Sequence, residues 1–339
     1  MQKKGRFVLY SLAPILYNIG IILGAVVLYP LIGVSGLAWG VVLGAFLHLV
    51  IQVPFICIKK VFPRIIMPDW KQIFRIVCVS LPRSLTLASS QLSMLVLFGI
   101  GAGLSGGTIA VFTFANNIQS VPFSLIAVSY SVAAFPVLVA MQAAKDHRQF
   151  LQTIRTSLRN VVLWSLLATA LFVVLRAQIV RTLLGSGAFD WNDTMLTGAV
   201  LAVFVLSLVA QGVSMLLVRS CYAMGKTLAP FFGAVLQFLV TVLAAWGSVQ
   251  FLAHNQQVAA FVAELFRVAP TDALLVLALA FGYSVGAYVH ALYMVVYVSR
   301  LYPLLFRGFV TPALQMLFAT LIFAHRNRIT AAFCGSRPL

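Results

Sequence analysis

Long, continuously apolar stretches follow one another through most of this 339-residue sequence. Most of them reach the roughly 20 residues that an α-helix needs to cross a hydrocarbon core about 30 Å thick. Backbone N–H and C=O groups find no partner in lipid, so each stretch must be helical. The uninterrupted apolar character excludes a transmembrane barrel, whose strands alternate. The stretches lie at about residues 8–30, 34–58, 79–103, 107–140, 160–176, 194–218, 228–252, 273–298 and 308–324.

The composition excludes an ordinary soluble domain. Apolar residues make up 62% of the chain and charged residues only 9%, whereas soluble domains carry about 25% charged residues. We therefore predict an all-α, polytopic integral membrane protein with about eight to nine transmembrane helices.

The positive charges are distributed unevenly over alternate connections. Of the 23 lysine and arginine residues, 17 fall in one set of connections, which includes the N-terminus, and three, Arg176, Arg181 and Arg267, fall in the other. The positive-inside rule then places the N-terminus in the cytoplasm and the loop at 253–272 outside. The net charge of +17 thus reflects topology, and we expect no nucleic acid as a partner.

Four segments are expected along the chain. Residues 1–58 hold two helices, 59–78 mix basic and apolar side chains as in a cytoplasmic amphipathic connection, 79–300 hold six helices, and 301–339 add a hydrophobic segment and a basic tail. The connection suits an anionic membrane surface, so membrane lipids are expected partners. Glycines four residues apart predict close helix packing, at Gly20 and Gly24, at Gly36, Gly40 and Gly44, and at Gly282 and Gly286.

The residues needed for enzyme chemistry are missing from the spans. All six acidic residues fall in connections, and the four cysteines show no spacing typical of a metal or redox site. We therefore expect no enzyme activity, no cofactor and no metal site. Ionisable residues within a span are functional candidates by default, and here they are His48, Arg83 and His290.

Polar side chains are concentrated on the third and fourth apolar stretches. Because such groups in a span must face one another or a water-filled cavity, this helix pair is predicted to form a cavity wall. Interhelical hydrogen bonds that only hold the helices together are the alternative. The predicted substrate path comprises Arg83, Ser90, Gln91, Asn116, Asn117, Gln119 and Ser120.

Seven segments in order resemble a known transporter family. They are APILYNIG at 13–20, GLAWG at 36–40, LHLVIQVP at 47–54, AFP at 134–136, LGSGAFD at 184–190, RSCYAM at 219–224 and KTLAP at 226–230. In these segments the chain is similar to the MurJ (MviN) lipid II flippases of the MATE-like MOP flippase superfamily.

The resemblance implies a two-lobe MATE-like fold that moves an undecaprenyl-diphosphate-linked peptidoglycan precursor across the bacterial inner membrane by alternating access. It also implies that this chain matches the family without its first four helices, so that a separate N-terminal lobe chain is a further expected partner. Asn117, in FANNI at 114–118, stands where the family carries a substrate-facing arginine. Two alternatives stay open, namely another exporter of the superfamily, for polysaccharide lipids or of the MATE type, and an inactive membrane fragment or scaffold.

Overall fold

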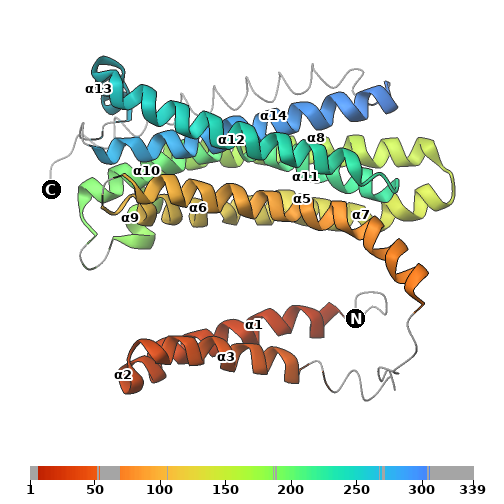
Figure 1. Ribbon diagram of the computed structural model, residues 1–339, viewed down its shortest axis with the longest axis horizontal. Coiled ribbons are helices and arrows are strands. Elements are labelled where there is room, and N and C mark those ends of the chain that lie inside the picture. Colours follow the sequence, from red (N-terminus) through yellow and green to blue (C-terminus); the bar gives the residue numbers. More distant parts are fainter. Residues whose placement is uncertain are drawn as a thin grey trace. The chain divides into compact units, whose positions relative to one another are not determined.

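The computed structural model forms two compact helical units, 1–70 and 71–339 (Figure 1). It describes residues 7–51, 53, 69–104, 106–185, 187, 189–266, 268, 272–303 and 305. The predicted hydrophobic segment at 308–324 and the first half of the predicted connection, residues 59–68, lie outside these residues. All regular structure in these ranges is helical, which confirms the all-α prediction for the described part of the chain.

The first unit is a tight helical hairpin. It consists of α1 (Phe7–Leu23), a π-helical turn η2 (Gly24–Leu28), α2 (Tyr29–Ile32) and α3 (Val34–Val50). A Cβ atom placed on Gly20 would overlap the backbone of Gly44, and one on Gly24 would overlap the backbone of Gly40. Only glycine permits such a close approach, so the predicted packing role of these glycines is confirmed.

The second unit holds the remaining helices that the structure describes. Its long elements follow the predicted apolar stretches, and two short helices, α9 and α13, lie between them. The elements are α5 (Trp70–Ala102), α6 (Thr108–Phe123), η3 (Ser124–Val128), α7 (Ser129–Ala143), α8 (His147–Val174), α9 (Arg176–Leu184), α10 (Trp191–Leu206), α11 (Leu208–Ala223), α12 (Leu228–His254), α13 (Gln256–Phe266), η4 (Asp272–Leu275) and α14 (Val276–Leu301).

Several boundaries differ from the hydrophobic pattern, for physical reasons. The helix predicted at 160–176 begins at His147, because the Asp146 carboxylate caps it by accepting the backbone N–H of Gln149 at 3.0 Å. The first turns of α8 are polar, so the hydropathy of the sequence does not indicate where this helix begins. The run predicted at 194–218 is divided at Ser207 and continues to Ala223. Residues 70–78 of the predicted amphipathic connection are helical and continuous with α5.

Seven helices of the described chain are long and apolar enough to cross a membrane. The predicted number of eight to nine is larger for two reasons. The helix α3 has 17 residues and falls just below that length, and the last predicted stretch is outside the described residues. With these helices, the chain is nevertheless a multi-pass membrane protein.

Two apolar cores hold the second unit together. The first gathers around Phe112 and Phe204, whose ring centroids are 5.0 Å apart, and the other around Leu138, Phe150 and Leu217. The helix α10 runs through the first core, and its residues from Leu196 to Val205 are all buried. A helix that is apolar on every side is typical of such a central position.

Candidate functional site: a polar cavity between two apolar cores

A cavity of about 520 Å³ lies within the second unit, a size in the range of small-ligand pockets. Its walls come from α5, α6, α7, α11, α12 and α14. Along α14 the cavity is lined by Tyr283, Ala287 and His290, which lie between the residues of the first core and those of the second. The cavity therefore lies among the membrane-spanning helices, between the two apolar cores.

The α5 wall carries hydroxyl groups at helical spacing. Residues 83, 86, 87, 90, 93 and 94 line the cavity, which is the one-face pattern of an α-helix. The hydroxyls of Thr86, Ser90 and Ser93 donate to the α5 carbonyls of Pro82, Leu87 and Ser89, at 2.8, 2.8 and 2.9 Å. Their donors are thus satisfied within the helix, and this wall offers oxygen lone pairs to the cavity.

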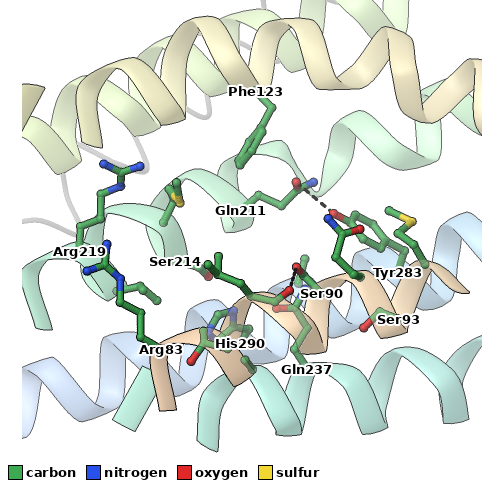
Figure 2. Close-up of a pocket in the computed structure, with 18 of the residues that line it drawn as sticks. Arg83, Ser90, Ser93, Phe123, Gln211, Ser214, Arg219, Gln237, Tyr283 and His290 are labelled. Atoms are coloured by element: carbon green, nitrogen blue, oxygen red, sulfur yellow. Dashed lines mark hydrogen bonds between the residues drawn. The ribbon is translucent and has the colours of Figure 1, made fainter. Parts of the chain in front are cut away.

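The α11 wall lies opposite, and it carries amide, hydroxyl and cationic groups. Gln211, Ser214, Met215, Val218, Arg219 and Tyr222 line the cavity along one face of the helix. Gln211 Nε2 donates to Ser207 Oγ at 2.7 Å, and Gln211 Oε1 accepts from the Tyr283 hydroxyl at 3.3 Å. These bonds tie α14 to the break between α10 and α11, and Figure 2 shows the bond between Gln211 and Tyr283 at one end of the cavity.

Two arginines lie at the other end of the cavity. In Figure 2 the guanidinium groups of Arg83 and Arg219 both lie on the side away from Tyr283, and they repel each other electrostatically. The Arg83 guanidinium also sits over the Tyr222 ring, 5.1 Å from its centroid. One end of the cavity is therefore cationic, and the rest is uncharged, with polar side chains among apolar ones.

Two polar atoms on the cavity lining have no hydrogen-bond partner. They are Ser214 Oγ and His290 Nε2. The side chains of Ser214 and His290 are 5% and 7% exposed. A buried donor or acceptor without a partner costs about 1–3 kcal/mol, so these atoms mark a place where a polar ligand or water belongs.

The structure brings four of the seven predicted path residues together. Arg83, Ser90, Gln91 and Asn116 line the cavity. The other three do not line it, because they point in other directions from α6. Asn117 and Ser120 are exposed, with Ser120 Oγ donating to the Asn117 carbonyl at 2.6 Å, and Gln119 is buried in the helix packing.

The two intramembrane histidines differ in their surroundings. His48 lies in the first unit, where its ring meets that of Tyr17 edge to face at 6.5 Å between centroids. His290 lies on the cavity, and its ring faces Gly233 of α12. Of the intramembrane candidates, Arg83 and His290 therefore belong to one site and His48 to another part of the fold.

The sequence argument missed the part of the site on α11, α12 and α14. Arg219 was assigned to a connection because the apolar run was expected to end at residue 218, whereas α11 continues to Ala223. Gln237 on α12 lines the cavity, but it does not belong to a cluster of polar residues in the sequence. The signal for α11 was its spacing, since residues 211, 214, 215, 218 and 222 fall on one helical face.

Comparisons with known proteins agree on a family. The family model described as lipid II flippase MurJ matches residues 1–324. The chain is 27% identical over 249 residues to a probable lipid II flippase MurJ from Bdellovibrio bacteriovorus, covering 72% of this chain and 47% of that protein. It is 23% identical over 255 residues to lipid II flippase MurJ from Burkholderia cenocepacia, covering 73% and 49%.

A solved structure has the same fold. It is that of lipid II flippase MurJ in an inward closed conformation, with a TM-score of 0.69 and 19% sequence identity over 97% of this chain and 63% of the other. The MATE-like fold class predicted from the sequence is thereby confirmed. The chain spans about half the length of the curated relatives that it matches.

The resemblance carried by seven short segments is thus confirmed over nearly the whole sequence, by a match that includes both helical units. On this match, the chain belongs to the MurJ lipid II flippase family.

Proposed function

We propose that this protein takes part in moving lipid II, an undecaprenyl-diphosphate-linked peptidoglycan precursor, from the cytoplasmic to the outer leaflet of the bacterial inner membrane. The observation that carries the proposal is the cavity with polar and cationic side chains between two apolar cores, among the membrane-spanning helices of a MurJ-family chain. Transport changes no covalent bond, so the proposed activity is not enzymatic.

The chemistry of the cavity fits an anionic, hydroxyl-rich headgroup. A diphosphate brings about two negative charges into a region of low dielectric constant, where arginines and amide donors offset the loss of water. Arg83 and Arg219 supply charge, while Gln91, Asn116 and Gln237 supply neutral donors. Outward movement of each negative charge is further favoured by about 2.3 kcal/mol per 100 mV of membrane potential, negative inside.

Alternating access requires two helical bodies that move against each other around a shared site. The chain covers 63% of the solved flippase chain, and its second unit alone contains the cavity. We propose that the remaining helices of the transporter are supplied by a further segment, in the same protein or in a separate N-terminal lobe chain. We also propose that the N-terminus of the present chain faces the cytoplasm, where the basic connections place it.

Reconstitution of residues 1–339 with fluorescent lipid II tests this proposal. Liposomes would contain the chain alone or the chain together with a co-expressed segment that carries the first four family helices. We expect accessibility of the label to an external quencher to increase in a protein-dependent way in the second case. Failure of both preparations to flip lipid II, with correctly inserted protein, would exclude the proposed activity and favour a scaffold role.

A different exporter function would give a different result in the same system. If a polysaccharide-linked diphosphate lipid were flipped and lipid II were not, the protein would be an exporter with another headgroup. The controls are empty liposomes and the double variant Arg83→Gln/Arg219→Gln, which removes both charges from the cavity and leaves its volume nearly unchanged.

A further inference from the structure

The short helix α13, between α12 and α14, is attached to the first apolar core along one side. Four residues at the three- and four-residue spacing of one helical face pack in or against that core, namely Ala259, Val262, Ala263 and Phe266. The Arg176 guanidinium holds the last turn of α13, because it donates to the Phe266 carbonyl at 3.1 Å and sits over the Phe266 ring, 5.3 Å from its centroid. Contacts with other helices therefore fix how α13 lies on the second unit.

The apolar surface of α13 is wider than the face that packs on the core. At about 100° per residue, Phe261 and Leu265 extend the core-facing side around one flank of the helix. Ala260, Glu264 and Gln257 lie on the other flank. Phe261 and Leu265 are 64% and 61% exposed, and the three residues of the other flank are exposed as well. The helix thus has one side toward the core, one open apolar flank and one open polar flank.

The level of α13 in the membrane follows from α12. That helix has 27 residues, and its length of about 40 Å at 1.5 Å per residue exceeds a hydrocarbon core of about 30 Å. Its ends therefore reach the headgroup regions. Only Asn255 separates the last residue of α12, His254, from the first residue of α13, Gln256, and Figure 1 shows α13 at the end of the second unit where α12 ends and α14 begins. The helix α13 therefore begins at the level of the lipid headgroups.

We propose that α13 lies in the plane of the membrane surface, with Phe261 and Leu265 inserted among the lipid chains and with Glu264 and Gln257 in water. A helix that runs along the interface needs this division between an apolar and a polar side. In the orientation proposed above, the surface belongs to the outer leaflet. The partner is phospholipid, and the proposal does not depend on which lipid-linked substrate the protein moves.

Phospholipid fits the open apolar flank better than a protein partner does. Directly before α13, the helix α12 exposes Leu243, Trp246 and Phe251, which are apolar side chains of the kind that a membrane-spanning helix presents to lipid. The apolar flank of α13 adds two large side chains on a helix about 16 Å long. Stable protein interfaces bury about 800 Å² on each partner, which is far more than two side chains provide.

The charge of α13 specifies the kind of lipid contact. Its eleven residues include one acidic side chain, Glu264, and no lysine or arginine. Surface helices that bind anionic lipids carry basic residues on their polar face. We therefore expect α13 to be held by insertion of apolar side chains and not by charge, so that its depth is the same in neutral and in anionic membranes.

Spin labels on two pairs of neighbouring residues test the depth of α13. A nitroxide is attached to the full chain in liposomes through one of four substitutions, Ala260→Cys, Phe261→Cys, Glu264→Cys and Leu265→Cys. Within each pair, 260 with 261 and 264 with 265, the labels point about 100° apart at nearly the same place along the helix. Molecular oxygen is concentrated in hydrocarbon and a nickel chelate in water. We expect oxygen to be the better relaxing agent at 261 and 265, and the chelate at 260 and 264.

The background for these labels retains one native cysteine. Cys57, Cys78 and Cys334 are replaced by alanine, and Cys221 stays because it is fully buried. The same background without an added cysteine gives the residual labelling, and gel filtration of each labelled variant establishes that it is folded.

Three results would overturn the proposal. Better relaxation by the chelate at all four positions would place α13 in water, and better relaxation by oxygen at all four would place it within the hydrocarbon. Low access of both agents at 261 and 265 would mean that protein covers this flank. Lipid II flipping is no part of the measurement, so the proposed function and the membrane contact of α13 stand or fail separately.

The role of charge is tested in the same system. The measurement is repeated in phosphatidylcholine liposomes with and without phosphatidylglycerol, and with Arg267→Gln, which removes the basic residue that follows α13 in the sequence. We expect the ratio of oxygen to chelate access at 261 and 265 to be unchanged in each case. An oxygen preference that requires the anionic lipid, or that is lost in Arg267→Gln, would show attachment by charge and would overturn the proposed apolar insertion.

Discussion

Replacement of Gly282 by alanine tests how closely α12 and α14 pack. A Cβ atom at residue 282 would lie 2.6 Å from both Cα and Cβ of Ala245, whereas ordinary contacts begin at 3.4 Å. The atoms that it meets belong to a backbone and to a methyl group that cannot rotate away, and Ala245 is fully buried. The backbone nitrogen of Ala245 is closer still, so the two helices must separate by about 1 Å at this crossing.

The size of the effect follows from that separation. A gap of 0.5–1 Å loses about a quarter to a half of the dispersion energy of each atom pair across it, and overpacked sites usually lose about 1–3 kcal/mol. Alanine in a helix recovers about 0.5–1 kcal/mol relative to glycine. We expect a net loss of about 1–2 kcal/mol in the free energy of unfolding, which corresponds to a melting temperature lower by about 1.5–3 °C for a chain of this length.

Thermal melting in detergent, followed by tryptophan fluorescence, measures this loss. The matched control is Gly247→Ala on α12, where no atom lies within 4 Å of the added Cβ. Its melting temperature should stay constant or rise, because only the propensity effect remains. The packing argument would be refuted if Gly282→Ala melted at the same temperature as the unsubstituted protein. It would also be refuted if Gly247→Ala lowered the melting temperature as much as Gly282→Ala.

Three further predictions concern the path, the orientation and the start of α8. Asn116 lines the cavity, so Asn116→Leu should lower lipid II flipping in liposomes without lowering accumulation in the membrane. An equal decrease in both would show that the amide only stabilises the fold. A cysteine introduced at Asn255 should react with an impermeant thiol reagent from outside and one at Lys145 should not; the reverse pattern would contradict the proposed orientation. Asp146→Ala removes the cap of α8 and should cost about 1 kcal/mol, seen as a lower melting temperature, while Asp146→Asn should melt close to the unsubstituted protein.

The helical class and the tight glycine contacts could be predicted because they depend on local pattern. Apolar runs in lipid admit only helices here. Glycines four residues apart, such as Gly20 and Gly24, form a continuous strip of small residues along one side of a helix, whichever element packs against it. The division at Ser207 could not be predicted, since neither proline nor glycine marks it. It depends on Ser207 Oγ, which donates to the Phe204 carbonyl at 2.6 Å and accepts from Gln211.

The candidate site was only partly predictable, because it depends on which helices meet. Polar clusters on α5 and α6 drew attention to Gln91 and Asn116, which do line the cavity. Neighbouring positions on α6 looked equivalent in sequence, although Asn117 lies 100° further round the helix and points outward. Arg219 and Gln237 come from different helices, and only the packing of α11 and α12 brings them to the same cavity.

The self-contained hydrogen bonding of α5 has a mechanical consequence. The hydroxyls of Thr86, Ser89, Ser90 and Ser93 all donate to carbonyls of α5 itself, and they move with the helix as one body. A sliding or tilting of α5 past α11 would break none of these four bonds. The resistance to such a movement then comes from apolar contacts such as Leu97 in the first core, which change gradually with displacement. A wall of this kind can widen or narrow the cavity without exposing a polar group that has lost its partner.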